Sequence, residues 1–157
     1  MPYSFGAMSK MELQGVHPSL VKVANLAISI CEQDFSVHDG LRTKVEQQKL
    51  VAKGASQTMN SMHLPQKDGF GHAVDLVPYI NGKLRWEWGP IYIIAESVHR
   101  AATELGVDLV WGGVWDIPLL KLTGTSKGLE KAVNEYVQRR VSKGRKAFID
   151  GPHYQLA

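Results

Sequence analysis

The sequence predicts an α+β fold with a small, mainly antiparallel sheet that is flanked by helices. Three observations lead to this class. Some segments repeat apolar residues at the 3.6-residue period of a helix, shorter segments alternate like strands, and Asn81-Gly82 is a strong hairpin signal. The 157 residues contain no internal repeat and no obvious linker, so we expect one domain that covers residues 1–157.

The expected helices have recognisable start and stop residues. A first helix is expected to start near Ser9 and to be interrupted near His17, and Pro18 starts a second helix. Thr43 and Glu46 form a capping box at the start of a third helix, which Gly54 ends. Pro90 lies in the first turn of a fourth helix, and Gly106 ends it. A last long helix has one apolar face, formed by Leu129, Val133, Tyr136, Val137 and Val141.

The expected strands are short. They cover Phe35 to Val37, which lead into Asp39-Gly40, and then residues 72–79, 83–86, 108–111 and 153–156. The strands at 72–79 and 83–86 form the hairpin around Asn81-Gly82. Because hairpin strands and helices are mixed along the chain, we expect the sheet to be mainly antiparallel.

The overall charge is mildly basic, with a formal charge of +3 at pH 7 and a pI of about 9.0. A nucleic-acid-binding domain usually carries a stronger basic patch with interleaved aromatic residues, so we expect no nucleic-acid partner. The main basic cluster is expected to be a solvated helix end, formed by Arg139, Arg140, Lys143, Arg145 and Lys146. An anionic cell-wall polymer is the alternative partner for this cluster.

Other classes of protein are excluded by the composition. No run of about 18 apolar residues is present, so we expect no stable membrane insertion. The N-terminal segment has no basic stretch followed by an apolar run, so we expect no secretory signal peptide. Cys31 is the single cysteine, which excludes an internal disulfide and a thiolate-rich zinc site. Because Cys31 falls in an apolar helical pattern, we expect a buried and unreactive thiol.

Residues suited to a zinc site occur in two parts of the chain. His63, His72 and Asp75 lie in one part, and Asp150 and His153 lie in the other. A catalytic zinc site needs three protein ligands and an open position for water. Apolar residues flank Asp75, so its burial without a partner would be costly. The spacing is not that of a compact metal motif, and a surface loop with incidental histidines stays an alternative.

His72 competes with His63 as a ligand because both are close to Asp75 in sequence. A residue three positions before Asp75 on a strand points to the opposite face, so we expect His72 to be turned away. The remaining histidines are expected to be structural or exposed, and they are His17, His38 and His99.

Several short motifs follow one another in a specific order. They are Gly-Leu-Arg-Thr at residues 40–43, Ser-x-His at 61–63, Gly-x-Ala-x-Asp at 71–75, Val-Pro-Tyr-Ile-Asn-Gly at 77–82, Trp-Gly-Gly-x-Trp at 111–115 and Asp-x-Pro-His-aromatic-Gln at 150–155. This order resembles the VanY-like zinc peptidases, which include D-alanyl-D-alanine carboxypeptidases and the L-alanyl-D-glutamate endopeptidases of phage endolysins. The resemblance spans most of the chain and implies a fold like that of Hedgehog and the D-Ala-D-Ala peptidases.

The resemblance also implies roles for individual residues. His63, Asp75 and His153 align with the family's metal ligands, so Zn²⁺ is the expected cofactor. Asp150 aligns with the catalytic acidic residue, which takes a proton from the attacking water and delivers it to the leaving amine. Arg42 aligns with an arginine that stabilises a developing oxyanion or holds a substrate carboxylate.

Ser61 and Trp115 are expected to orient the site or to contact the substrate. Each functional interpretation has a structural alternative. Asp150 would be a turn residue, Arg42 a partner in a surface ion pair, and Ser61 a local cap. Trp111 and Trp115 would pack against the neighbouring glycines instead of lining a cleft.

Three features depart from the family's pattern. The interval from His63 to Asp75 is longer than in the compact form of the motif, which puts the shape of this loop in question. Val114 stands where many relatives have an aspartate. The stretch from residue 116 to residue 148 is longer than in the shortest phage endopeptidases, and its helix either shapes the cleft or covers the sheet.

The function implied by the resemblance is that of a zinc-dependent L-alanyl-D-glutamate endopeptidase, a phage or prophage endolysin that cuts the stem peptides of peptidoglycan. The alternatives are a D-alanyl-D-alanine carboxypeptidase and a non-catalytic zinc or wall-binding module. We expect a monomer that stays in the host cytoplasm without a signal peptide and acts at the cell wall after the membrane has been permeabilised.

Overall fold

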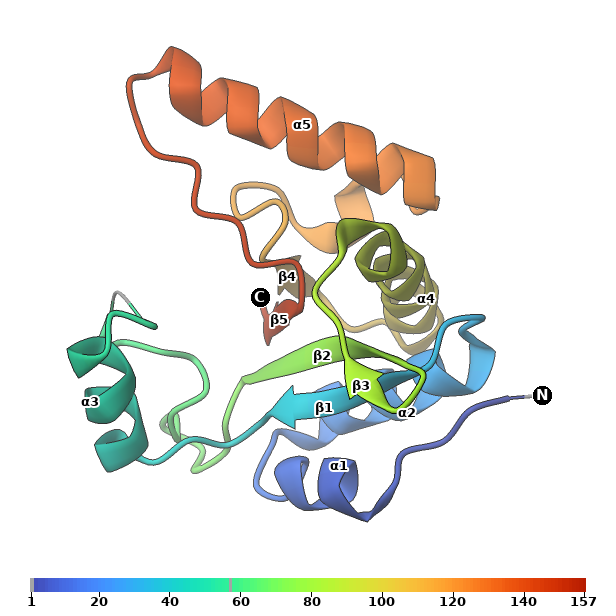
Figure 1. Cartoon of the computed structure of the whole chain (residues 1–157), viewed down its shortest axis with the longest axis vertical. Helices are drawn as coiled ribbons and strands as arrows, with labels where there is room; N and C mark the ends of the chain where they lie inside the picture. Colours follow the sequence, from blue (N-terminus) through green and yellow to red (C-terminus); the bar gives the residue numbers. More distant parts are fainter. Residues whose placement is uncertain (1, 57) are drawn as a thin grey trace.

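The computed structural model describes residues 2–56 and 58–157 and confirms the α+β class (Figure 1). Each predicted helix and strand is present to within a few residues. In chain order the elements are α1 (Ala7–Glu12), α2 (Pro18–Ile30), β1 (Phe35–Asp39), α3 (Lys44–Ala52), β2 (Ala73–Ile80), β3 (Lys83–Leu84), α4 (Trp88–Leu105), β4 (Leu109–Trp111), the 3-10 turn η1 (Leu119–Lys121), α5 (Ser126–Ser142) and β5 (His153–Leu156).

Strand β5 lies inside the sheet although it comes last in this order. The strands are arranged β1-β2-β5-β4, all neighbours are antiparallel, and β3 pairs with β2 beside this path. Asp75 of β2 is therefore directly opposite His153 of β5, and it is also paired with Asp39 of β1 on its other side. The sheet thus brings together polar residues from distant parts of the sequence.

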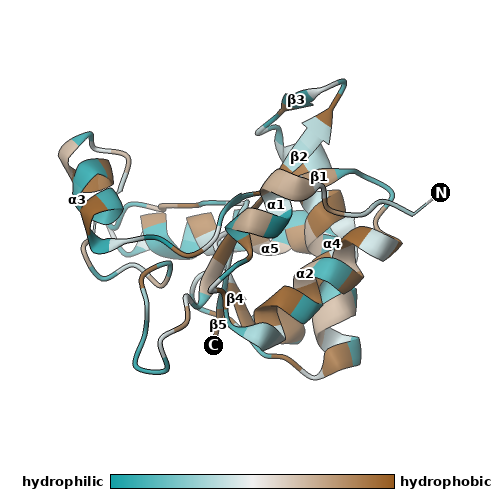
Figure 2. Cartoon of the chain, turned by 90° about the horizontal axis from the view of Figure 1, so that it is seen from below, coloured by the Kyte–Doolittle hydropathy of each residue, from teal (hydrophilic) through white to brown (hydrophobic). Residues whose placement is uncertain are grey.

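The hydrophobic core is built by the sheet and by helices α2 and α4. These two helices pack against each other, and α4 also contacts β2 and α5. Fully buried side chains in this core include Leu20, Val23, Leu76, Ile94 and Leu109. Helix α3 stands apart from α2 and α4 in both views, with the centre of the sheet between them (Figures 1 and 2). In α3 the buried residue is polar rather than apolar, namely Gln47.

Local sequence signals account for several element boundaries. Thr43 and Glu46 form both hydrogen bonds of the capping box at the start of α3. Asn81 and Gly82 have φ angles of 52° and 76°, as a tight hairpin turn between β2 and β3 requires. Gly106 ends α4 in the left-handed conformation that glycine adopts easily.

Two expectations about element ends were wrong. Strand β3 ends at Leu84 rather than near Trp86, because the chain leaves the hairpin to enter α4. Val141 is 63% exposed although its spacing placed it on the apolar face of α5, because the buried residues of α5 end at Tyr136. The thiol of Cys31 is buried, as expected. Within the described ranges, no helix combines the length and the apolar character needed to cross a membrane.

Candidate active site

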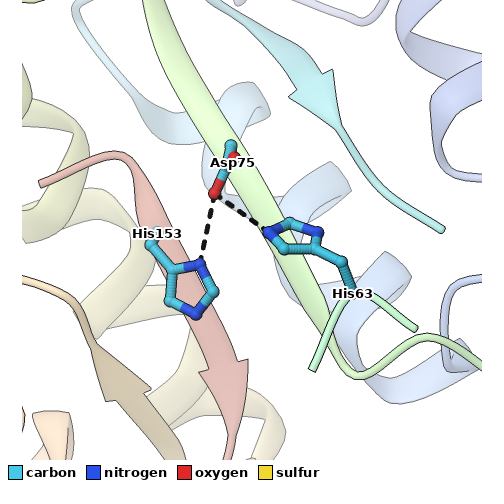
Figure 3. A group of neighbouring side chains, drawn as sticks. All are labelled: His63, Asp75 and His153. Carbon is cyan, nitrogen blue, oxygen red and sulfur yellow. Dashed lines mark hydrogen bonds and ion pairs between the residues drawn. The ribbon is translucent and has the colours of Figure 1, made fainter. Parts of the chain in front are cut away.

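Three residues that are far apart in the sequence converge beside the sheet (Figure 3). Asp75 is on β2, His153 is the first residue of β5, and His63 lies in the loop that joins α3 to β2. Asp75 Oδ1 is 3.3 Å from His63 Nε2 and 3.3 Å from His153 Nδ1. Because the ligand atoms of all three side chains lie within 4.8 Å of one another, the group is compact enough to hold a metal ion.

The long interval between His63 and Asp75 is accommodated by a loop that folds back on itself. The backbone N–H of Arg42 donates to the carbonyl of His63 at 2.8 Å, and the N–H of His72 donates to the carbonyl of Met62 at 2.7 Å. The first bond fastens the start of the loop to the segment before α3, and the second joins the start of the loop to its end, just before β2. The additional residues therefore extend away from the metal-binding group without displacing His63.

The outer nitrogen of each histidine is engaged by a hydrogen bond. His63 Nδ1 is 2.8 Å from the carbonyl oxygen of Gly40, so this nitrogen carries the proton and donates. His153 Nε2 is 2.8 Å from Gln155 Oε1 and donates in the same way. In the neutral rings the lone pairs of His63 Nε2 and His153 Nδ1 then face Asp75. Metal-binding histidines in proteins have this arrangement, with the second nitrogen bonded to a carbonyl or carboxylate.

The electrostatics of the group favour a bound cation. Burial alone would raise the pKa of Asp75, but hydrogen bonds from His153 and His63, which these rings donate when they are protonated, outweigh it and hold that pKa well below its usual range. Burial alone would lower the pKa of His153, but the same carboxylate raises it above the ordinary value. Asp75 is therefore an anion that attracts positive charge between the two rings. A donor set of two imidazole nitrogens and one carboxylate suits zinc.

His72 is turned away from this group, as expected. Its Nε2 is 2.8 Å from Asp68 Oδ2, and its ring lies edge-on to His17 with the centroids 5.4 Å apart. His17 has a structural role, because its Nδ1 accepts a hydrogen bond from the backbone N–H of Ser19 at the start of α2. His72 is therefore not a competing ligand in this arrangement.

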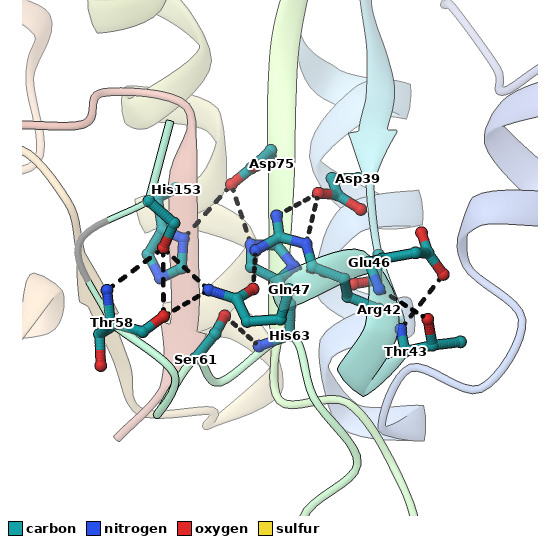
Figure 4. A network of polar contacts seen from close by, with 12 residues as sticks. Asp39, Arg42, Thr43, Glu46, Gln47, Thr58, Ser61, His63, Asp75 and His153 are labelled. Atoms are coloured by element: carbon teal, nitrogen blue, oxygen red, sulfur yellow. Dashed lines mark hydrogen bonds and ion pairs between the residues drawn. The ribbon is translucent and has the colours of Figure 1, made fainter. Parts of the chain in front are cut away.

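Arg42 lies in the wall of the cleft, but its charge is already paired (Figure 4). The side chain is 8% exposed. Its Nε and Nη2 donate to Asp39 Oδ2, the former at 3.0 Å, and its Nη1 donates to Gln47 Oε1 at 2.6 Å. The ion pair that was the alternative for Arg42 is thus present, in a buried rather than a surface setting. The pair fixes the guanidinium group beside the candidate metal ligands.

Asp150 also faces the cleft, and its environment raises the pKa of its carboxyl group. Burial is the largest cause and the nearby charge of Asp75 adds to it, although His153, His63 and Arg42 oppose this shift. The raised pKa makes the Asp150 carboxylate a stronger base than the carboxylate of an exposed aspartate.

The backbone of Asp150 is held at the end of β4. Its N–H donates to the carbonyl of Gly112 at 2.8 Å, and its carbonyl accepts from the N–H of His153 at 3.1 Å. A Cβ atom on Gly112 would lie 2.1 Å from the Asp150 carbonyl oxygen, so only glycine fits at this position. The Trp-Gly-Gly segment therefore positions Asp150, a role that its sequence did not reveal.

The two tryptophans of that segment have different environments. Trp111 is fully buried, packs against Gly113 and donates from Nε1 to the carbonyl of Gly151 at 2.7 Å. Its packing interpretation is therefore confirmed. Trp115 lines the cleft, its ring centroid is 5.1 Å from that of His153, and its Nε1 donates to the carbonyl of Phe148 at 3.0 Å.

A cleft of about 800 Å³ contains the whole group. Ser61 and Met62, from the loop after α3, line it together with Trp115, Phe148 and Asp150. The Ser61 hydroxyl accepts a hydrogen bond from the N–H of His63 at 3.1 Å. Ser61 is thus a local cap and a cleft residue at the same time.

Gln47 was not identified from the sequence. Its side chain is fully buried, accepts from Arg42, and donates from Nε2 to the carbonyl of Thr58 at 2.6 Å and to Ser56 Oγ at 2.8 Å. It therefore connects Arg42 to the loop that precedes Ser61. One feature of the sequence could have revealed Gln47. The segment that forms α3 has no apolar face, so a polar side chain of this helix has to make its contacts with the rest of the protein.

Comparison with known proteins agrees with this geometry. A family model described as phage L-alanyl-D-glutamate peptidase matches residues 1–127. The chain belongs to this family. An L-alanyl-D-glutamate peptidase of Escherichia phage T5 is 32% identical over 120 residues, which are 74% of this chain and 84% of that protein. A crystal structure of the Serratia marcescens L-Ala D-Glu endopeptidase ChiX is 36% identical, has a TM-score of 0.70, and covers 99% of this chain and 90% of its own.

The two matches differ in how many of the candidate site residues they contain. The family match contains Arg42, His63 and Asp75 but ends before Asp150 and His153. The structural match to ChiX covers nearly the whole chain and so includes the region of β5. The resemblance inferred from the short motifs is confirmed at the level of the family, together with the fold that it implied.

The hydrogen bond between His153 and Gln155 leads to a prediction about metal affinity. We expect Gln155→Ala to weaken zinc binding about 10–100-fold, because the His153 ring loses the acceptor that fixes its tautomer and orientation. Competition with a chromogenic chelator measures this change. Gln138→Ala, on the exposed face of α5, is the control and should bind zinc like the unmodified protein. Equal affinities of the Gln155 variant and the control would contradict the role of this bond.

Proposed function

We propose that the chain is a zinc-dependent L-alanyl-D-glutamate endopeptidase that cuts the stem peptides of peptidoglycan, as a phage or prophage endolysin does in host lysis. The observation that carries the proposal is the group of His63, Asp75 and His153 inside a cleft, with Asp150 beside it. Membership of the phage L-alanyl-D-glutamate peptidase family supports this choice of bond.

The residues of the group fit a catalytic zinc ion. His63 Nε2, His153 Nδ1 and a carboxylate oxygen of Asp75 would hold it, because their outer hydrogen bonds leave these atoms free to bind. Three protein ligands in an accessible cleft correspond to a catalytic rather than a closed structural site. When bound, zinc supplies Lewis-acid chemistry that polarises a peptide carbonyl and lowers the pKa of water.

Asp150 would act as the general base and then the general acid. Its carboxylate accepts a proton from the attacking water and returns it to the amine that leaves when the peptide bond breaks. A pKa raised by burial and by Asp75 strengthens the carboxylate of Asp150 as a base. A binding module without catalysis needs no such residue, which argues against the non-catalytic alternative.

The remaining cleft residues would position the substrate. Arg42 keeps N–H groups beyond those bonded to Asp39 and Gln47, and these can donate to a substrate carbonyl or to a developing oxyanion. Ser61 and Trp115 both line the cleft, where they would contact the peptide. The D-alanyl-D-alanine carboxypeptidase alternative uses the same metal and proton chemistry, so the choice rests on the relatives that the chain resembles.

The proposal extends to the organisation of the protein. A single catalytic domain would cover residues 1–157, since the structural match to ChiX spans 99% of the chain. We propose that it works as a monomer and reaches peptidoglycan from the host cytoplasm once the membrane has been permeabilised. The similarity to a peptidase of a phage supports this route.

Digestion of purified peptidoglycan tests the choice of bond. We expect new N-terminal D-glutamate and new C-terminal L-alanine, because the bond between these residues is the one that relatives are named for. Mass spectrometry of the released fragments identifies both termini. Release of free D-alanine without new glutamate termini would instead favour the carboxypeptidase alternative.

Metal content tests the ligand assignment. We expect one zinc per chain by elemental analysis, and loss of that zinc in His63→Ala, Asp75→Ala and His153→Ala, because each change removes one of three donors. His72→Ala is the matched control and should keep its zinc, since His72 bonds to Asp68 instead. Full zinc occupancy in all three ligand variants would contradict the assignment.

Asp150→Asn separates catalysis from metal binding. The amide keeps the shape of the side chain but cannot accept the proton, so we expect hydrolysis to fall about 10²–10⁴-fold while zinc content and melting temperature stay unchanged. Asp108→Asn, at an exposed aspartate before β4, should retain full activity. A variant at Asp150 with activity within a few-fold of the unmodified enzyme would show that another group is the base.

A further inference from the structure

An exposed tryptophan lies on the face of the sheet that carries the candidate metal ligands. Trp86 belongs to the segment between β3 and α4 and is 53% exposed. The hairpin continues by one hydrogen bond beyond β3, because the N–H of Arg85 donates to the carbonyl of Pro78 at 2.8 Å. The same register sets Trp86 opposite Val77. Paired residues share a face of the sheet, and Val77 shares its face with Asp75, two residues earlier on β2.

An irregularity in β1 turns a second aromatic side chain toward the same face. The register of β1 with β2 shifts between Val37 and Asp39, so His38 is an extra residue without a partner on β2. In a regular strand, successive side chains face opposite sides. At this bulge His38 and Asp39 both line the cleft.

Trp86 and His38 are in contact, and both lie close to Asp75. Their rings meet edge to face, with the centroids 5.7 Å apart and an angle of 88° between the planes. Asp39, the neighbour of His38, is paired with Asp75 across the sheet. Paired Cα atoms are about 5 Å apart and consecutive ones about 3.8 Å apart, so the Cα atom of His38 lies within about 9 Å of that of Asp75. The two rings therefore continue the cleft along the sheet from the candidate metal ligands.

The position of Trp86 is fixed although its side chain is exposed. The backbone of Arg85 is bonded to β2, and Glu87 is the N-cap residue of α4. The side chains of these two neighbours are paired, since Arg85 Nε donates to Glu87 Oε1 at 2.7 Å. Trp86 thus presents a rigid apolar face with charged groups beside it. Such a face binds a ligand at a low cost in conformational entropy.

The direction of the substrate follows from the proposed function, on which this inference rests. In the sheet order β1-β2-β5-β4, His38 is on β1, whereas Asp150 is bonded to Gly112 at the end of β4. The candidate ligands Asp75 and His153 lie between them, on β2 and β5. The leaving amine must be within hydrogen-bond reach of Asp150 to receive its proton. The acyl part of the substrate therefore extends the other way, toward β1.

The acyl part of a peptidoglycan stem is short and ends in a sugar. L-Alanine is the first residue of the stem, and a lactyl group joins its nitrogen to a muramic acid ring of the glycan. One residue and one lactyl group span about 7 Å, which is comparable to the reach from Asp75 to His38. The C–H face of a sugar ring is apolar and packs against an aromatic plane. Its hydroxyl and acetamido groups can form hydrogen bonds with polar side chains at the rim.

We propose that Trp86 and His38 form a subsite for the sugar ring to which the stem peptide is attached. Trp86 stacks on the ring, and His38 supports Trp86 from the cleft. The enzyme then prefers stem peptides that are still linked to glycan over free peptides. The contact is remote from the reacting bond and equal in the ground and transition states, so the preference appears in KM rather than in kcat.

A pair of soluble substrates isolates the sugar. Both are L-alanyl-D-glutamyl-L-lysine peptides with the same C-terminus. In one the alanine nitrogen carries N-acetylmuramic acid, and in the other it carries a lactyl group alone. For the unmodified enzyme we expect a KM about tenfold lower for the muramyl peptide, with kcat values within twofold of each other. Equal KM values would overturn the subsite, and this comparison does not depend on the folding of any variant.

Trp86→Ala tests the ring itself. It should raise the KM for the muramyl peptide to that for the lactyl peptide and leave the lactyl peptide unchanged, because Trp86 contacts only the sugar. Trp86→Phe should keep part of the preference, since it retains an aromatic face. Tyr3→Ala removes an exposed aromatic ring from the N-terminal segment and is the control, which should keep the full preference. An equal rise in KM for both peptides in Trp86→Ala would contradict the assignment to a sugar.

Binding measurements separate a failure of the subsite from a failure of the proposed function. If the unmodified protein cleaves neither peptide, the proposed bond choice is wrong. The calorimetric affinity of the zinc-loaded protein for the two peptides then decides the inference. Tighter binding of the muramyl peptide that is lost in Trp86→Ala supports the subsite, and equal affinities overturn it.

Discussion

The antiparallel pairing of β2 with β5 is the constraint on which the site depends. It sets Asp75 directly opposite His153, and the carboxylate can therefore reach both histidine rings. Side chains alternate between the two faces of a sheet, so a shift of one residue in this register would move His153 to the other face. The hydrophobic core keeps the register fixed, because Val74 and Tyr154, the pair next to Asp75 and His153, are buried. Stability and chemistry thus rest on the same strand pair.

Around this pair, each polar group of the candidate site is held by a hydrogen bond to another residue. Gly40 and Gln155 orient the two histidines, Asp39 and Gln47 hold Arg42, and Gly112 holds Asp150. Two of these partners, Gly40 and Gly112, act through backbone carbonyls, whose positions are set by the fold and not by side-chain choice. This arrangement fixes the geometry before a metal or a peptide is bound, which lowers the reorganisation required during the reaction.

Sequence reasoning was most successful where structure is local. The capping box of Thr43 and Glu46 and the turn at Asn81-Gly82 could be predicted because a few neighbouring residues determine them. The family resemblance grouped His63, Asp75 and His153 as ligands of one site, and the structure places these three residues together. The place of β5 between β2 and β4 could not be derived, since it depends on contacts across the whole chain. The buried role of Gln47 was missed for the same reason. Val141 was placed on the buried face of α5 because periodicity gives the direction of a side chain but does not show how far along the helix burial extends.

The late position of β5 in the chain has a consequence for the synthesis of the protein. Chains emerge from the ribosome N-terminus first, and His153 follows Asp75 by 78 residues. Until β5 has emerged, β2 and β4 have no strand between them and the metal site has two of its three candidate ligands. A partly made or prematurely terminated chain therefore cannot assemble the centre. Under the proposed function, hydrolytic activity arises only in molecules whose translation has passed β5.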